Sequence, residues 1–204
     1  DMPAQEHAPG SGNVFNVLKN RTVALGIGAC GAFFMGQFVL FTYVRPFLET
    51  VTQVGVSTLS LILLAIGIAG FIGTALIGFM LNRGLYKVLV VTPLLMAVIA
   101  VALIFFGTWM AAVATLLGLW GLLATAAPVA WWSWVADVMP DQAEAGGGLM
   151  VAVIQLSIAL GSTLGGLLFD SAGYQSAFGA SALVLLFAAL LAFLTSRVQP
   201  GEVA

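Results

Sequence analysis

Charge is what this sequence has least of. Only 7% of its 204 residues are Asp, Glu, Lys or Arg, whereas 61% are hydrophobic. A soluble globular domain carries about 25% charged residues, so a water-facing surface is excluded. With lipid as the surrounding solvent, apolar side chains can point outward and the few charges can stay in the loops.

Catalytic and nucleic-acid-binding features are also missing. The one histidine, His7, lies in a polar N-terminal stretch, and no HExxH, Gly-x-Ser-x-Gly or P-loop pattern occurs. No apolar run has a firm Asp or Glu in its interior, so we expect no catalytic pair, no metal site and no cofactor there. The net charge of −2 includes no basic block, which argues against nucleic acid as a partner.

The N-terminal stretch resembles no leader segment. Residues 1–16 are polar, the first residue is not methionine, and no basic flank leads into a short apolar core, so a signal peptide is not expected. We interpret residues 1–20 as a cytoplasmic linker in the middle of a longer protein and residues 198–204 as a cytoplasmic tail. The single cysteine, Cys30, cannot form an internal disulfide.

Six apolar runs are long enough to cross a bilayer, which takes about 20 residues as a helix. Only a helix satisfies its own backbone in lipid, so the sequence predicts an all-α membrane protein with its bundle over residues 21–197. Lys and Arg gather almost entirely on the side of the two termini, which places both ends in the cytoplasm. The predicted spans are Thr22–Val44, Thr58–Met80, Val88–Phe106, Met110–Trp132, Gly146–Phe169 and Ala177–Ser196.

The spacing of these spans indicates an internal duplication. Span four begins about 88 residues after span one, and spans five and six follow spans two and three by nearly the same shift. Three helices followed by three of opposite orientation form a 3+3 inverted repeat, which is typical of transporters; chance similarity of helix lengths is the alternative. Spans three and six have few polar residues, so we expect them to face lipid and the other four to pack and line a cavity.

Small residues recur at helical spacing on three of the spans. Such stripes let two helix backbones approach closely in lipid, so we interpret them as packing surfaces. They are Ala24, Gly28, Ala32 and Gly36 in span one, Ala65, Ala69, Gly70, Gly73, Thr74 and Gly78 in span two, and Ser157, Gly161 and Gly165 in span five.

Two glutamines are the clearest binding candidates. Gln37 lies opposite the small stripe of span one, and Gln155 shares a face of span five with Ser162 and Gly166. An amide facing lipid would lack hydrogen-bond partners, so each glutamine should face a partner or water. They either bind substrate in a central cavity or form hydrogen bonds between helices.

The remaining polar and aromatic candidates each have a structural alternative. Arg45 either lies at the outer mouth of a pathway or pairs with Glu49 at the membrane surface. Trp131, with Trp132 and Trp134, either stacks on a flat substrate or belongs to an interfacial aromatic belt. Asp141 and Glu144 fit a helix N-terminus, where negative charge is favourable, and Asp137 and Asp170 are loop acids without an assigned role.

Several stretches, in this order, resemble the C-terminal six-helix half of transporters of the major facilitator superfamily. The resemblance is strongest to the bacterial drug:proton antiporter group, which contains sugar and purine ribonucleoside efflux pumps, and within it to the nucleoside exporters. The stretches are Phe41-Thr42-Tyr43-Val44-Arg45-Pro46, Gly67-Ile68-Ala69-Gly70-Phe71-Ile72-Gly73-Thr74, Asp141-Gln142-Ala143-Glu144 and Val151-Ala152-Val153-Ile154-Gln155-Leu156.

The superfamily's loop motif is present in altered form. It stands here as Gly78-Phe79-Met80-Leu81-Asn82-Arg83-Gly84, with Asn82 in place of an acid. The resemblance therefore implies a gating contact through Arg83, without the charge relay that the acid would provide.

The resemblance implies a twelve-helix fold in a bacterial inner membrane, of which this chain is one half. The expected activity is proton-coupled export of small polar molecules, such as nucleosides, sugars or drugs, by alternating access. The expected partners are the N-terminal six-helix half, the bilayer, a small polar solute and protons. A half-size transporter that acts as a dimer and a non-transporting membrane scaffold are the alternatives.

Overall fold

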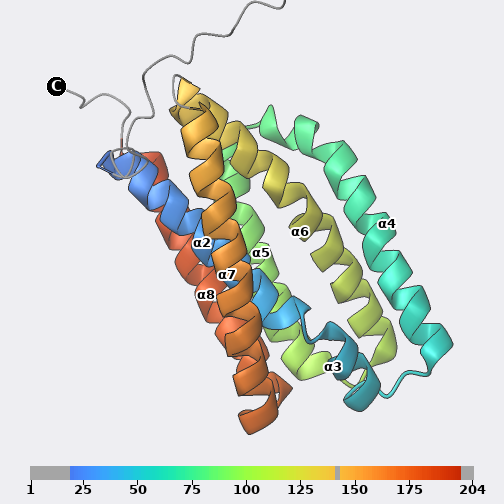
Figure 1. Cartoon of the computed structure of the whole chain (residues 1–204). Coiled ribbons are helices and arrows are strands. Elements are labelled where there is room, and N and C mark those ends of the chain that lie inside the picture. Colours follow the sequence, from blue (N-terminus) through green and yellow to red (C-terminus); the bar gives the residue numbers. More distant parts are fainter. Residues whose placement is uncertain (1–18, 141–142, 199–204) are drawn as a thin grey trace, which may run out of the picture.

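The computed structural model describes residues 19–140 and 143–198, apart from the side chains of residues 143 and 144 (Figure 1). This part of the chain is helical and contains no strand. Six helical segments are long and apolar enough to cross a membrane, so the predicted all-α architecture is confirmed. The helices are α2 (Arg21–Phe41), α3 (Val44–Thr50), α4 (Val56–Leu81), α5 (Leu85–Phe106), α6 (Met110–Val138), α7 (Ala143–Ala172) and α8 (Tyr174–Arg197).

The first span is interrupted near its end. We expected one helix to Val44, but α2 ends at Phe41 and α3 begins at Val44. The Thr42 hydroxyl donates to the carbonyl of Phe38 at 2.9 Å, a bond that competes with regular helix geometry. Pro46 lies in the first turn of α3, where its missing N–H costs no helical hydrogen bond.

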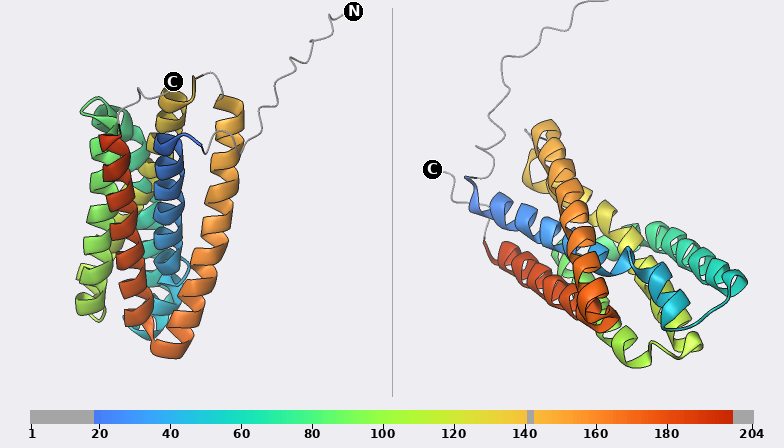
Figure 2. Two further views of the ribbon diagram at one scale, coloured as in Figure 1. Left: turned by 90° about the vertical axis from the view of Figure 1, so that its left-hand side faces the viewer. Right: turned by 60° about the horizontal axis from the view of Figure 1, so that its bottom comes forward.

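The pairing of the helices has an internal symmetry. α2 packs against α7 and α8, α6 packs against α4 and α5, and α5 packs against α8. Exchanging α2 with α6, α4 with α7 and α5 with α8 leaves this set of pairs unchanged. Figure 2 shows α5 and α8 together on one side of the bundle and α7 on the other, with both ends of the described chain at the same end of the bundle. The arrangement agrees with the inverted repeat.

Individual glycines repeat the same symmetry. Gly84 and Gly173 precede α5 and α8, the third helices of the two triplets, and both have positive φ, at 127° and 81°. This backbone region is accessible to glycine at little cost. A Cβ on Gly73 of α4 would meet the carbonyl of Leu122 on α6, and one on Gly161 of α7 would meet the carbonyl of Met35 on α2. These two helix crossings are thus built in the same way.

The predicted small stripes are packing surfaces to different extents. Gly161 and Gly165 approach the backbone of α2, which confirms the stripe of span five. The stripe of span one is confirmed at Gly36, which approaches Leu185 of α8, but Gly28 is exposed. The stripe of span two is partly wrong. Gly70 and Gly73 pack against α6, but Ala65 and Gly78 are exposed, because α6 covers only one side of α4.

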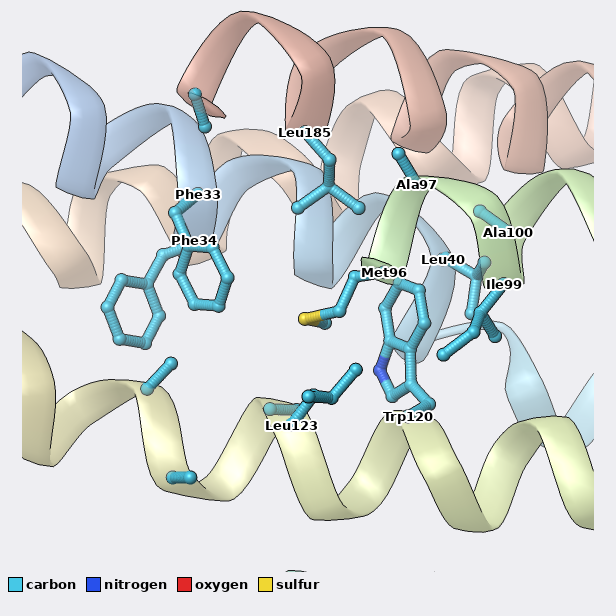
Figure 3. Packing of buried hydrophobic residues seen from close by; sticks show 14 of the residues in the cluster. Phe33, Phe34, Leu40, Met96, Ala97, Ile99, Ala100, Trp120, Leu123 and Leu185 are labelled. Atoms are coloured by element: carbon cyan, nitrogen blue, oxygen red, sulfur yellow. The ribbon is translucent and has the colours of Figure 1, made fainter. Parts of the chain in front are cut away.

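A continuous core lies between α2, α5, α6 and α8. Figure 3 shows Phe33 and Leu40 of α2, Met96 of α5 and Trp120 of α6 converging there, with Leu185 of α8 nearby. α4 and α7 are the least buried of the spanning helices. α5 and α8 each bury one face and expose another that is apolar, through Val91, Leu94, Leu95 and Val98 on α5 and Leu183, Leu186, Phe187 and Leu190 on α8.

Candidate functional site

Gln37 is a polar side chain enclosed in the bundle. The residue is 8% exposed, and its Oε1 finds no hydrogen-bond partner among the described residues. Burial of an unpaired amide oxygen is costly, and such groups are rare in folded proteins. The interhelical hydrogen bond that we considered for Gln37 is therefore not formed by this oxygen, and Gln37 stays the strongest binding candidate.

Helical spacing shows which neighbour Gln37 faces. A Cβ on Gly26 of α2 would meet the ring of Trp134 on α6, so Gly26 marks the side of α2 that faces α6. Gln37 lies eleven residues further on, or about three helical turns, and so points to the same side. Phe33, one turn before Gln37, also lies on this side.

A small cavity opens beside this side of α2. Its volume is about 10 Å³, which is enough for about one water molecule, and it is lined by side chains of α2, α5 and α6. Pro93 in the middle of α5 has no N–H to donate to the carbonyl of Leu89, one turn earlier. The buried Thr92 hydroxyl lies next to it, so a mostly apolar cavity has polar groups at its α5 wall. The lining residues are Phe33, Val88, Leu89, Thr92, Pro93, Ala127, Ala130 and Trp131.

Trp131 belongs to this cavity and not to the surface. It is 3% exposed, and its ring meets that of Trp134 edge to face, with centroids 6.0 Å apart. Trp134 is fully buried, whereas Trp132 is 43% exposed. Of the three tryptophans, only Trp132 is placed as an interfacial aromatic belt requires, because the rings of Trp131 and Trp134 turn inward against α2 and α5.

Gln155 lies apart from Gln37. It is exposed on α7, and it takes part in no hydrogen bond within the described chain, so the expected bond between helices is not formed. Its predicted face is divided, because Ser162 and Gly166 contact the end of α2. The Tyr43 hydroxyl donates to the carbonyl of Ser162, and the Thr42 and Ser162 hydroxyls are joined, each at 2.9 Å.

Arg45 is paired at the end of the bundle far from the termini. Its Nε donates to Oε1 of Glu49 one turn along α3, at 2.9 Å, and both side chains are largely exposed. This is the ion pair that we considered at the sequence level. Exposed pairs of this kind contribute little to stability.

The altered loop motif lies at the opposite end, beside the termini. Gly78 is exposed on α4, and Asn82 caps the C-terminus of that helix. The Arg83 guanidinium lies over the ring of Phe79, 4.5 Å from its centroid. Arg83 is thus held at the surface of α4 by a cation–π contact.

The acidic residues form no cluster in the described chain. Asp137 and Asp170 are exposed in the last turns of α6 and α7, so their prediction as loop acids is wrong. No group of His, Cys, Asp and Glu in this part of the chain could hold a metal ion. Asp141 and the side chain of Glu144 lie outside the described residues, so their expected role at the start of α7 stays a prediction.

Sequence reasoning missed Trp120. This residue of α6 is fully buried, and its indole Nε1 has no partner in the described part of the chain. Within an apolar run a tryptophan is not distinguishable from other core residues by periodicity. The one available signal was that tryptophan carries an N–H donor, which normally finds a partner when it is buried.

Comparison with known proteins adds a family match. A family model described as the Major Facilitator Superfamily matches residues 25–204. This match confirms the resemblance that the sequence motifs indicated, and it agrees with the expectation that the chain is not an enzyme.

Curated relatives match over about half of their own length. The chain is 38% identical over 187 residues to the purine ribonucleoside efflux pump NepI of Escherichia coli K12, covering 92% of this chain and 47% of the pump. The NepI protein of Salmonella enteritidis is 36% identical over 188 residues, with the same coverage. The transcription regulatory protein OpdE of Pseudomonas aeruginosa is more similar, at 62% identity over 199 residues, 96% of this chain and 50% of that protein.

Proposed function

Because the chain belongs to the Major Facilitator Superfamily, we propose that it is the C-terminal half of a transporter that exports small polar molecules such as nucleosides or sugars. Export proceeds by alternating access and is driven by inward proton flow. Gln37 carries the proposal, because it is a buried amide with an unpaired oxygen inside an apolar bundle. Polar groups at such positions are expensive and mark substrate pathways.

The proposed partner is a second six-helix half, packed against α4 and α7. These are the least buried spanning helices, and a Cβ added to Gly67, Gly78 or Gly148 on them would contact no other element of the described chain. Small residues on exposed helix faces suit the close approach of another helix. Gln155 lies on the same face of α7 as Gly148 and would then be covered by the partner half.

The other candidates take supporting roles in this proposal. Trp131 forms part of the apolar wall of the cavity, which Phe33 lines one turn before Gln37 on α2. Arg45 lies at the outer mouth, and Arg83 with Gly78 and Asn82 makes a gating contact on the inner side. The whole transporter lies in the inner membrane of a bacterium, with both ends of this chain in the cytoplasm. The basic residues Lys19, Arg21, Arg83, Lys87 and Arg197 support that orientation.

A resistance assay tests the export function. Cells that overproduce the full-length protein should tolerate higher concentrations of toxic purine nucleosides than cells with an empty vector. The Gln37→Ala variant should lose this resistance, while Asn16→Ala, a change in the polar N-terminal stretch, should keep it. Unchanged sensitivity with the protein present in the membrane would contradict nucleoside export.

Proton coupling needs its own measurement. Everted membrane vesicles that contain the protein should accumulate radiolabelled inosine when respiration energises them. A protonophore should abolish that accumulation, because it collapses the gradient that drives exchange. Accumulation that persists in the presence of the protonophore would exclude protons as the coupling ion.

A second candidate function is regulation from the membrane without transport. The observation that favours it is the 62% identity to a relative whose name describes a transcription regulatory protein. In that case, deletion of the gene should change transcript levels while nucleoside accumulation stays at the wild-type value. A dimeric half-size transporter instead predicts export by this chain alone.

A further inference from the structure

The exposed apolar face of α5 ends in a cation, at the end of the bundle that carries the termini. Val91, Leu94 and Val98 follow Lys87 by four, seven and eleven residues, so all four side chains lie on one face of the helix. All four are exposed, and Val98 is 65% exposed. Lys87 is the one charged residue of α5.

Helix α8 has the same pattern in the opposite chain direction. Leu190, Leu186 and Leu183 precede Arg197 by seven, eleven and fourteen residues, and they are exposed on the face that Arg197 shares. Arg197 is the one charged residue of α8. Each of the two helices thus presents an exposed apolar face with a single cation at its end.

The two cations lie at nearly the same depth along the bundle. The Tyr174 hydroxyl at the start of α8 donates to the carbonyl of Ile104 near the end of α5, at 3.3 Å, so the two helices are antiparallel neighbours. The Arg197 guanidinium folds back over the ring of Phe193, 4.8 Å from its centroid. Phe193 is 19 residues after Tyr174, a rise of about 29 Å. Lys87 is 17 residues before Ile104, a rise of about 26 Å.

The two exposed faces form one surface on the outside of the bundle. Figure 2 shows α5 and α8 together on one side of it. We call this apolar area, with Lys87 and Arg197 at its rim, the α5–α8 surface. The axes of packed helices are about 8–10 Å apart, so both long side chains can reach one group placed between them. A lone cation at a helix end extends into water, but two that converge concentrate positive charge.

No acid of the described chain pairs with these two cations. The ion pair within residues 19–140 and 143–198 is Arg45–Glu49, at the other end of the bundle. Asp137 lies at the same end as the cations, but it is on α6 and forms no ion pair with either of them. The α5–α8 surface therefore favours an anion from outside the described chain.

We propose that the α5–α8 surface binds an anionic phospholipid, with its phosphate between Lys87 and Arg197 and its acyl chains along the apolar faces of the two helices. The Arg197 guanidinium stacks its plane on Phe193 and keeps the N–H groups at its edge for two bonds to the phosphate. Lys87 adds a second positive charge, and basic residues at a membrane surface attract anionic lipids. The surface is separate from α4 and α7, against which the proposed second half packs.

A second copy of the chain is a poorer match for this surface. Copies in one membrane share the same orientation, so a symmetric pair would bring Lys87 and Arg197 of one copy against the same residues of the other. Like charges that meet at an interface oppose association. A phospholipid of opposite charge meets both the apolar and the charged part of the surface.

The test is native mass spectrometry of the full-length, delipidated protein, titrated with phosphatidylglycerol or with phosphatidylcholine of the same acyl chains. The first phosphatidylglycerol should bind about 25-fold more tightly than the first phosphatidylcholine, since each cation near the membrane surface contributes about fivefold. Lys87→Gln and Arg197→Gln should each weaken phosphatidylglycerol binding about fivefold and leave phosphatidylcholine binding unchanged.

Arg83→Gln is the matched control, because it removes a cation at the same end of the bundle that is held over Phe79 of α4. It should stay within about twofold of the wild type in phosphatidylglycerol affinity. Arg197→Lys keeps the charge and should lose less affinity than Arg197→Gln. Thermal unfolding reports whether each variant folds. Equal affinity of the wild type for the two lipids would overturn the inference, and so would equal losses from Arg83→Gln and Arg197→Gln.

Cross-linking tests the second copy as the occupant. A Val98→Cys variant of the full-length protein should form no disulfide between copies in native membranes, and the buried Cys30 should not interfere. Efficient cross-linking would assign the surface to a second copy and overturn the inference. Neither measurement depends on transport, so a protein that exports no nucleoside can still be tested for this lipid site.

Discussion

At the scale of single residues, glycines determine how closely these helices approach one another. The backbone of Gly161 lies so near to the carbonyl of Met35 that a Cβ would collide with it, and backbone cannot move aside as a flexible side chain can. Gly148 lies on the same helix, but a Cβ added there would contact no other element of the described chain. The two positions differ in environment but not in residue type or helix.

This pair gives a matched prediction. Gly161→Ala should destabilise the protein by about 1–3 kcal/mol, because α7 must move away from α2. In the six-helix segment expressed alone, where no partner half covers α7, Gly148→Ala should be neutral or slightly stabilising, because alanine favours a helix over glycine. Thermal unfolding in detergent measures both. Equal effects of the two changes would contradict the close crossing.

Cys30 allows a second prediction at the residue scale. This residue of α2 is 0% exposed, so a maleimide reagent should not reach it in the folded protein. Labelling should become complete after unfolding in denaturant. Rapid labelling of the native protein by N-ethylmaleimide would mean that α2 is not packed as described.

At the scale of elements, residues at the break between α2 and α3 contact α7. The Tyr43 hydroxyl donates to the carbonyl of Ser162, and the ring of Tyr43 stacks on Phe169 with centroids 5.4 Å apart. Phe47 of α3 packs against Tyr174 and Phe178 of α8. The interrupted first span is thereby held to both helices of the second triplet that lie against it.

Removal of the Tyr43 hydroxyl alone tests how much this contact with α7 stabilises the fold. Tyr43→Phe should cost about 0.6 kcal/mol, the average for a hydrogen bond between helices in a membrane protein. Tyr43→Ala should cost more, because the stacked ring is also lost. Thermal unfolding of the two variants separates the contributions, and an equal loss would assign the whole effect to the hydrogen bond.

At the scale of the whole molecule, an even number of spans puts both ends of the bundle on one side of the membrane. The exposed Thr50 and Asn82 lie at opposite ends, and Cys30 is buried, so single added cysteines can report topology. In intact cells, an impermeant maleimide should label Thr50→Cys. It should label Asn82→Cys only after the membrane is permeabilised, and the reverse pattern would contradict cytoplasmic termini.

The interface with a second half also belongs to this scale. The exposed face of α4 should become protected when the partner half is present, since a Cβ on Gly67 would contact no other element of the described chain. A Gly67→Cys variant should therefore react more slowly with a maleimide in the full-length protein than in this six-helix segment expressed alone. Equal reactivity would exclude α4 from the interface.

The spans, the repeat and the helical class followed from the sequence because hydropathy and spacing are local properties. The burial of Gln37 also followed, because an amide cannot face lipid without partners. The same rule did not distinguish Gln155, which is exposed on α7, from the buried Gln37. Periodicity gives the face of a helix on which a residue lies, but not what covers that face.

Only the tertiary structure decided which helices are neighbours, and the neighbours determine which side chains belong to the candidate site. Trp131 and Trp134 turn inward because α2 and α5 pack against that side of α6, and Trp120 draws notice only because its indole N–H is buried without a partner in the described chain. Sequence fixes the chemistry of each side chain, whereas burial and pairing depend on contacts between segments that are distant along the chain.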